Sequence, residues 1–279
     1  MRALVSTSEL ADLLKNSPPP VLLDVRWALG GPPGRESYVA GHLPGAVFVD
    51  LDAELAAPPG EGGRHPLPEP GDLQEVLRAA GVNQDSAVVV YDGGNGSVAA
   101  RAWWLLRWAG HSNVAVLDGG YAAWQGEERP VITEVPQPQR GDIEVRPGGM
   151  PTVDADGAAE LARSGVLLDA RAPERYRGET EPVDPRAGHI PGAVNAPFAG
   201  HTGEDGRWLP VAALAERFRS LGVHDAAAVG AYCGSGVTAS SVVLALEVSG
   251  LTDGQHPAAL YPGSWSQWSS DPARPAETG

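Results

Sequence analysis

The segment GHLPGAVFVDL (41–51) recurs as GHIPGAVNAPF (188–198), and this repetition decides the fold. Three further pairs keep the same order: LLDVR (22–26) with LLDAR (167–171), AVVVYDGG (87–94) with AVGAYCGS (228–235), and VLDGGYAAW (116–124) with ALYPGSWSQW (259–268). Four ordered matches at nearly constant spacing predict an internal duplication. We therefore expect one domain in residues 1–128, a Pro-rich linker in 129–150 and a second domain in 151–279.

Short apolar runs alternate with segments of helical character in each half. Ser8–Lys15, for example, begins with an N-cap residue and carries Leu10, Leu13 and Leu14 at helical spacing. Strands that alternate with helices predict an α/β fold with two domains, each a parallel sheet flanked by helices. The expected strands are Val21–Leu23, Ala87–Val90 and Val114–Leu117, and the expected helices are Ser8–Lys15, Pro70–Ala80, Val98–Ala109, Asp156–Arg163, Val211–Leu221 and Val237–Val248.

The composition excludes several classes of function. A net charge of −15 argues against a nucleic-acid partner, because phosphate binding needs clustered Lys and Arg. An anionic substrate must instead be attracted by a local basic patch. Cys233 is the only cysteine, so an intramolecular disulfide and a Cys-rich metal site are excluded. We expect neither a metal nor a cofactor.

We also expect no membrane segment. The N-terminus, MRALVSTSELADLLKN (1–16), lacks the uninterrupted apolar core of a secretory signal. Ala226–Leu246 carries no charged residue and is long enough to span a bilayer. Its centre, YCGSGVT (232–238), nevertheless predicts a buried strand, a Gly-rich turn and a helix. We expect the protein to be cytoplasmic. We also expect it to be a monomer.

The turn YCGSGVT (232–238) is the strongest chemical signal in the chain. Gly234 and Gly236 allow successive backbone N–H groups to face inward as an anion nest, and the following helix adds its positive end. Both effects stabilise a thiolate at Cys233, as a sulfur nucleophile requires. The alternative is a small buried hydrophobic residue. The position of Cys233 at the tip of a strand, before a glycine, favours catalysis.

Together, the duplicated halves, the GHIPG boxes, the paired Trp endings and the lone loop cysteine resemble a tandem-domain rhodanese sulfurtransferase. The resemblance covers residues 4–268 and implies that sulfur is carried on Cys233 as a persulfide. It also implies a first domain without a cysteine, and Asp92 stands at the equivalent place. The loop CGSGVTA (233–239) is similar to that of mercaptopyruvate sulfurtransferases, whereas thiosulfate-specialised members have Arg and Lys after the cysteine.

The resemblance also implies a hydroxyl relay. In the mercaptopyruvate members a loop Ser couples to a His and an Asp of the other domain, which match Ser235, His65 and Asp52 here. The chemistry agrees, because pyruvate leaves as an enolate that needs a proton, whereas sulfite departs without one. From the residues alone, His65 would be a surface histidine in a loop.

Substrate recognition is expected from arginine and from the cysteine loop. Arg175 matches the family arginine that binds the donor carboxylate, and a guanidinium fits a carboxylate well. Arg186 is a second candidate, although it lies closer to His189 than the family pattern predicts. Either arginine could instead be a solvated surface charge. The loop residues expected to line the donor site are Gly234, Gly236, Val237 and Thr238.

Residues that occur at matching positions in both halves are expected to be structural. His42 and His189 should tie loops to neighbouring backbone, and Asp24 and Asp169 should anchor the loops after matching strands. The tryptophans expected in the core are Trp103, Trp104, Trp108, Trp265 and Trp268.

The sequence thus favours an enzyme that moves sulfur from 3-mercaptopyruvate, through Cys233, to a thiol or cyanide. A small thiol or a thioredoxin-like protein would serve as acceptor. Thiosulfate:cyanide sulfurtransferase remains one alternative, and a non-catalytic binding module is another. A Cys-dependent phosphatase is disfavoured, because Ala239 stands where such an enzyme needs an arginine.

Overall fold

The computed structural model describes residues 1–224 and 228–279, and these residues form two compact units. Each unit is built mainly from one half of the chain and includes a short segment from the other half. The first unit contains Met1–Ala57, Pro68–Gly149 and Thr202–Trp208. The second unit contains Pro58–Leu67, Met150–His201 and Leu209–Gly279.

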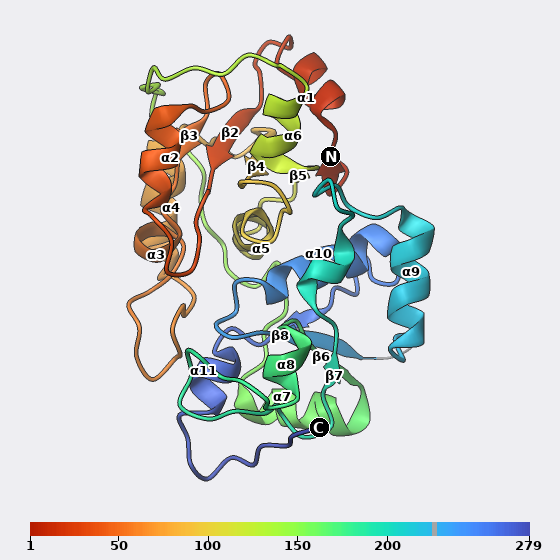
Figure 1. Ribbon diagram of the computed structural model, residues 1–279. Coiled ribbons are helices and arrows are strands. Elements are labelled where there is room, and N and C mark those ends of the chain that lie inside the picture. The colour runs from red at the N-terminus through yellow and green to blue at the C-terminus, as the bar shows by residue number, and fades with distance from the viewer. Residues whose placement is uncertain (225–227) are drawn as a thin grey trace. The chain divides into compact units, whose positions relative to one another are not determined.

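The first unit is organised around a sheet with strand order β1-β5-β4-β2-β3, in which every pairing is parallel (Figure 1). Its strands are β1 (Leu4–Val5), β2 (Val21–Asp24), β3 (Val47–Phe48), β4 (Val88–Tyr91) and β5 (Val114–Leu117). Its helices are α1 (Thr7–Leu13), α2 (Gly34–Ala40), α3 (Leu51–Glu54), α4 (Pro70–Ala79), α5 (Ala99–Trp108) and α6 (Gly120–Gly126).

The second unit repeats this plan around a parallel sheet with strand order β7-β6-β8-β9. Its strands are β6 (Val166–Asp169), β7 (Val194–Asn195), β8 (Val229–Tyr232) and β9 (Ala259–Leu260). Its helices are α7 (Ala155–Ser164), α8 (Pro173–Tyr176), the 3₁₀ helix η1 (Phe198–His201), α9 (Val211–Ser220), α10 (Ala239–Ser249) and α11 (Ser264–Trp268). The expected α/β fold with parallel sheets is confirmed.

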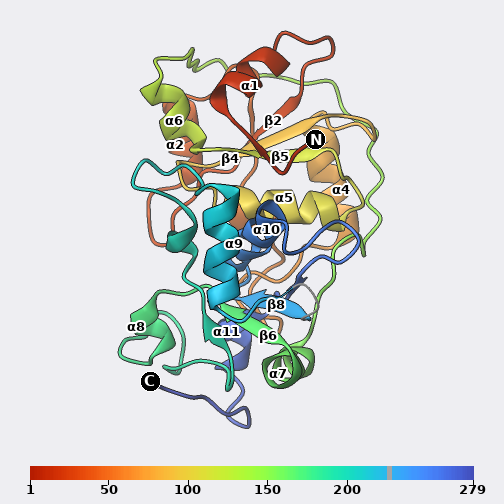
Figure 2. The same cartoon turned by 90° about the vertical axis from the view of Figure 1, so that its right-hand side faces the viewer.

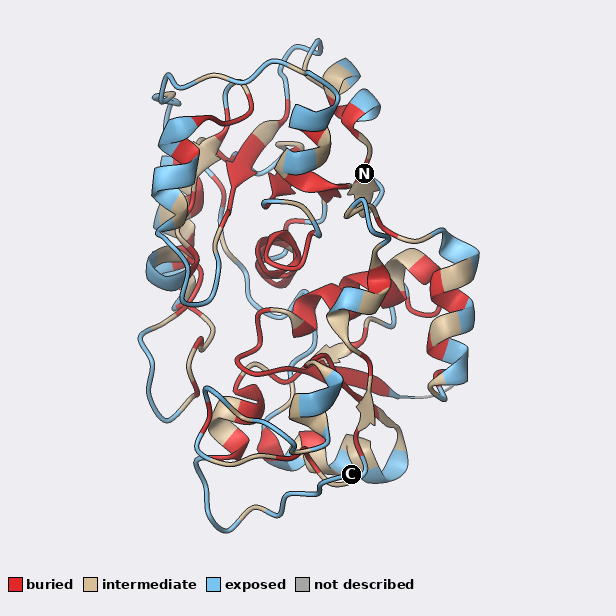
Figure 3. Ribbon diagram, viewed as in Figure 1, coloured by how far each residue is buried: buried red, intermediate tan, exposed pale blue. Residues whose placement is uncertain are grey.

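Burial explains why these segments fold as they do. Every residue of β4 and β8 is buried, as expected for central strands of a sheet covered on both faces. The helices that follow them, α5 and α10, are buried on nearly all sides (Figure 3). In the second unit, α10 also packs against α9 (Figure 2). The five tryptophans expected in the core are all buried.

The helix boundaries differ from the expected ones by a few residues. The clearest difference is at α1, where Ser6 rather than Ser8 is the N-cap. Ser6 and Glu9 satisfy each other's backbone N–H groups in a capping box, which fixes the helix start two residues earlier. The two-residue strands β1, β3, β7 and β9 carry too little periodicity to be predicted.

The segment expected to be a linker, 129–150, packs along the first unit as far as Gly149. Ile143 is fully buried, and its N–H donates to the carbonyl of Val82. The N–H of Arg146 likewise donates to the carbonyl of Ala109. This stretch therefore has a defined path despite its proline content.

Two Gly-rich segments pack in the unit opposite to their sequence half. We name Pro58–Leu67 the first strap and Thr202–Trp208 the second strap. The first strap comes from the N-terminal half but belongs to the second unit, and the second strap does the reverse. This exchange places His65 in the unit that contains Cys233.

Within the described residues, no helix has both the length and the apolarity needed to cross a bilayer. Of the uncharged stretch singled out above, Ala226 and Ala227 lie outside the described residues. The remainder forms β8, the cysteine turn and most of α10.

Candidate active site

Cys233 follows β8 directly, where the strand ends and the chain turns toward α10. The side chain is buried, with 1% exposure. The N–H of Gly236 donates to Cys233 Sγ at 3.1 Å, so the turn closes on the sulfur as the nest requires. Gly236 has a φ of +80°, and a Cβ there would lie 2.4 Å from the carbonyl oxygen of Pro262. Glycine is therefore needed at this position.

The equivalent turn of the first unit contains Asp92. Its backbone N–H groups bind a carboxylate, that of Asp92 itself. One oxygen of the Asp92 carboxylate accepts from the N–H groups of Gly94 and Gly96, at 2.9 and 3.0 Å. The other accepts from those of Val98 and Ala99, at 2.9 and 3.1 Å. The turn after this strand thus holds an anion, which supports the same electrostatic role at Cys233.

Ser235 and His65 meet beside the cysteine turn. Their Oγ and Nδ1 atoms are 2.7 Å apart, and both residues are more than nine-tenths buried. The structure therefore brings together two members of the expected relay from positions far apart in the sequence. The hydroxyl lies two residues along the turn from Cys233.

The first strap reaches this place through its own turn and two contacts. Gly60 and Gly63 exchange backbone hydrogen bonds at 3.0 and 2.9 Å. The N–H of Arg64 donates to Ser266 Oγ, and the Gln267 amide donates to the carbonyl of Glu61. Helix α11 therefore holds the strap on both sides of its tip.

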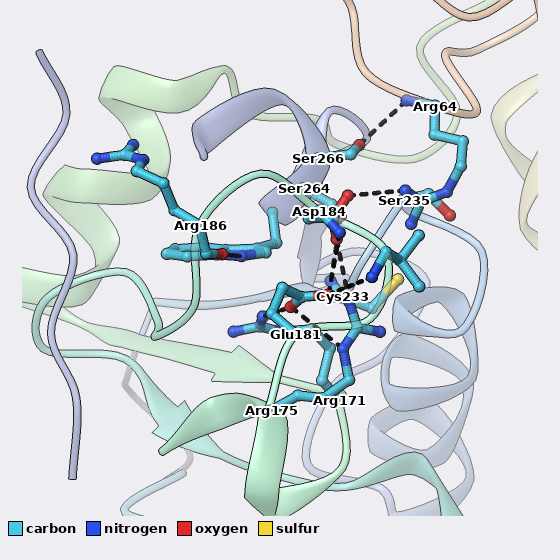
Figure 4. A network of polar contacts seen from close by, with 12 residues as sticks. Arg64, Arg171, Arg175, Glu181, Asp184, Arg186, Cys233, Ser235, Ser264 and Ser266 are labelled. Carbon is cyan, nitrogen blue, oxygen red and sulfur yellow. Dashed lines mark hydrogen bonds and ion pairs between the residues drawn. The ribbon is translucent and has the colours of Figure 1, made fainter. Parts of the chain in front are cut away.

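Two guanidinium groups approach the turn at Gly234 (Figure 4). A Cβ on Gly234 would lie 3.1 Å from Arg64 Nη2 and 3.5 Å from Arg175 Nη1. Both arginines bind Asp184, through Arg64 Nη1 at 2.7 Å and Arg175 Nη2 at 3.0 Å. Neither Arg64 Nη2 nor Arg175 Nη1 makes a hydrogen bond within the described residues, so both remain available to an anion beside the turn.

Arg64 was missed by the sequence reasoning, although a signal existed. The strap GEGGRHPLP (60–68) recurs as GEDGRWLP (203–210), which pairs Arg64 with Arg207 and His65 with Trp208. This fifth repeat would have drawn attention to both straps. It would have pointed to Arg64 as well as to His65.

Arg186 is used elsewhere, and the structure does not bring it to the cysteine turn. Its guanidinium points away from Cys233 (Figure 4). It donates to four backbone carbonyls at distances of 2.7–3.0 Å, where it secures the C-terminal segment. The four acceptors are Trp268, Ser269, Asp271 and Arg274.

The remaining expected residues lie as follows. Asp52 is in α3 of the first unit, where its Oδ2 accepts from the Trp27 indole N–H at 2.8 Å. Val237 is buried in the turn, and Thr238 is the N-cap residue of α10. Burial raises the pKa of Tyr232, next to Cys233, well above its usual value, so this phenol remains neutral.

The symmetric residues are structural, as predicted. His42 Nδ1 contacts the carbonyl of Tyr38 at 2.8 Å, and His189 Nδ1 contacts that of Tyr176 at the same distance. Each imidazole also stacks on the tyrosine ring. Asp24 accepts the backbone N–H of Arg26 and binds the guanidinium of the same residue, so that both carboxylate oxygens are used. Asp169 binds Arg171 in the same way.

The family model described as Rhodanese-like domain matches residues 6–127 and again residues 154–271. SseB of Mycobacterium tuberculosis, named a thiosulfate sulfurtransferase, is 45% identical over 100% of this chain and 98% of its own. A protein of Pseudomonas aeruginosa named a 3-mercaptopyruvate sulfurtransferase is also 45% identical, over 99% and 98% of the two chains. The crystal structure of SseA from Escherichia coli, described as a 3-mercaptopyruvate sulfotransferase, superposes with a TM-score of 0.82 at 32% identity, covering 95% of this chain and 100% of that one.

Proposed function

The chain belongs to the rhodanese family, and from this premise we propose that it transfers sulfur from 3-mercaptopyruvate to a thiol or cyanide. The sulfur is carried as a persulfide on Cys233. The observation that carries the proposal is the 2.7 Å contact between His65 and Ser235, two of the three residues expected to form a proton relay. The relatives named as 3-mercaptopyruvate sulfurtransferases support the same donor.

In the first half-reaction the Cys233 thiolate attacks the sulfur of the donor. A bond forms between Sγ and that sulfur, and the carbon–sulfur bond breaks with its electron pair moving into the pyruvate enolate. The N–H of Gly236 stabilises the negative sulfur before and after transfer. Because no electrons enter or leave the system, the step needs no redox cofactor.

The donor carboxylate binds between Arg64 and Arg175. The two free guanidinium edges beside Gly234 provide N–H donors from two sides, which fixes the orientation of the donor as well as its charge. We therefore propose for Arg64 the role that the sequence suggested for Arg186.

The leaving enolate takes its proton from the Ser235 hydroxyl, and His65 restores that proton. Asp52 is proposed as the third member of the relay, where its carboxylate would favour the protonated imidazole of His65 during the proton transfer. A hydroxyl relay of this kind matters for an enolate and little for sulfite, because sulfite is a stable anion.

In the second half-reaction an acceptor thiolate attacks the outer sulfur of the persulfide and releases the Cys233 thiolate. The chain has no other cysteine, so the acceptor is a separate molecule. Small thiols and thioredoxin-like proteins have the required chemistry, and cyanide yields thiocyanate.

Intact mass spectrometry tests the proposal directly. After treatment with 3-mercaptopyruvate the protein should gain one sulfur atom, and cyanide should remove it. Cys233→Ser should show neither event, whereas Ser220→Ala, a change on the exposed side of α9, should behave as the wild type. Turnover by Cys233→Ser would refute the assignment.

Thiosulfate is the second candidate donor, because the Mycobacterium tuberculosis relative carries that name at 45% identity. The turn, however, has Gly234 and Ser235 in place of two cations. Comparing kcat/KM for both donors in the wild type separates the two functions.

A further inference from the structure

The arginines beside the cysteine turn belong to a continuous row of ion pairs. Starting from the buried end, Asp169 binds Arg171 at 2.6 Å, and Arg171 binds Glu181 at 3.3 Å. Glu181 binds Arg175 at 2.6 Å. Asp184 then binds Arg175 at 3.0 Å and Arg64 at 2.7 Å (Figure 4). We call this row the charge ladder; its members in order are Asp169, Arg171, Glu181, Arg175, Asp184 and Arg64.

The formal charges of the charge ladder cancel. Three guanidiniums alternate with three carboxylates, and each of the carboxylate side chains is less than 5% exposed. Solvent therefore screens these groups weakly, and each carboxylate offsets its arginine neighbours at short range. The two guanidinium edges at Gly234 offer directed N–H groups without a strong net positive field.

Such a site discriminates between anions by their charge. A singly charged carboxylate gains hydrogen bonds from both arginines and needs little net attraction. A dianion of similar size loses more hydration on entry and needs an excess of positive charge to compensate. The position of Asp184 is decisive, because among the described residues it is the one carboxylate that contacts both arginines at the turn.

We propose that Asp184, as the shared counter-ion of Arg64 and Arg175, selects a monoanionic sulfur donor against dianionic thiosulfate. Asp184 is a positioning and specificity residue, since it acts through the two arginines. This inference rests on the proposed function, and it adds a determinant of donor choice that is separate from the hydroxyl relay.

The test is Asp184→Asn in the full chain, with kcat/KM measured for both donors at several salt concentrations. The change keeps the shape of the side chain and adds one net positive charge beside the arginines. The ratio of thiosulfate to 3-mercaptopyruvate activity should rise on the order of tenfold, and thiosulfate turnover should become more sensitive to salt. Asp184→Glu, which restores the charge, should return the ratio toward the wild-type value.

Glu179→Gln is the matched control, because Glu179 lies on the same loop and its one ion pair within the described part of the chain is with exposed Arg177. It adds the same net charge and should leave the donor ratio unchanged. If Asp184→Asn does not fold, Glu181→Gln carries the test, since it removes the next carboxylate of the charge ladder and should shift the ratio in the same direction.

An unchanged ratio in a folded Asp184→Asn protein, or equal losses for both donors, would overturn the inference. A shift of equal size in Glu179→Gln would also overturn it, because net charge alone would then explain the effect. A wild-type protein that forms no persulfide with either donor would instead refute the proposed function itself, and the inference with it.

Discussion

At the scale of single residues, the proposed donor site depends on the two arginines at Gly234. Each offers a charge-assisted hydrogen bond, worth roughly 1.5–3 kcal/mol. Arg64→Ala and Arg175→Ala should therefore each reduce kcat/KM for 3-mercaptopyruvate about tenfold to over a hundredfold, chiefly through KM. Arg175→Lys should recover only part of the loss, because Lys lacks the planar fork. Steady-state kinetics check this, with Arg177→Ala as the exposed control; normal kinetics in both alanine variants would place the carboxylate site elsewhere.

The hydroxyl relay makes a different prediction at the same scale. Ser235→Ala and His65→Ala should lower kcat for 3-mercaptopyruvate by roughly 10²–10⁴-fold, the usual range for general acid–base help. Thiosulfate turnover should fall much less, because sulfite needs no proton to depart. Side-by-side kcat values for both donors provide the measurement. Equal losses would mean that Ser235 and His65 only hold the turn in shape.

At the scale of elements, the sequence predicted the regular parts well and the loops incompletely. The runs at β2, β4 and β5 are continuous and apolar, so their pattern alone identified them. The contact between His65 and Ser235 depends on where a long loop packs, and no local pattern encodes that; only the family resemblance suggested it. Arg186 was only a second candidate for the donor carboxylate, and sequence spacing does not reveal that its guanidinium donates to four backbone carbonyls.

The first strap can be tested as an element through its glycines. Gly63 has a φ of +101°, and a Cβ there would lie 2.7 Å from the carbonyl oxygen of Gly263. Gly63→Ala should displace the strap at a cost of about 1–2 kcal/mol or more, and lower kcat/KM for both donors about tenfold. Gly60→Ala is the control, because open space surrounds that position. Identical kinetics in the two variants would show that the strap tolerates movement at its tip.

At the scale of the whole molecule, buried histidines make stability depend on pH. Burial, with a smaller contribution from Arg217, lowers the pKa of His201 to about 3, and burial also lowers the pKa of His111. Both groups take up protons more readily when unfolded, so their contribution is complete above about pH 6.5 and is lost as the pH falls. The unfolding free energy from urea titration should drop by roughly 2 kcal/mol or more between pH 7.5 and 5.

This drop should be smaller in His201→Gln, and His256→Gln, a change at an exposed histidine, is the control. Glu127, whose pKa is lowered to about 2 by Thr7 and then Arg129, titrates below this window and does not confuse it. Stability that stays constant from pH 7.5 to 5 would contradict the assignment of neutral buried histidines.

The duplication itself leads to the last prediction, because the equivalent turns of the two units carry different residues. The turn of the second unit carries the proposed nucleophile Cys233, whereas in the first unit the Asp92 carboxylate accepts hydrogen bonds from four N–H groups of its turn. The straps differ as well: His65 contacts Ser235, while Trp208 lies close to Gly96 of the Asp92 turn. A buried carboxylate with four donors is a stabilising feature, so Asp92→Asn should lower the unfolding free energy by about 2–4 kcal/mol. Persulfide formation at Cys233 should persist under native conditions. Asp253→Asn provides the control, because Asp253 caps two N–H groups at an exposed site; equal stability of the two variants in urea would mean that the Asp92 turn gains nothing from its anion.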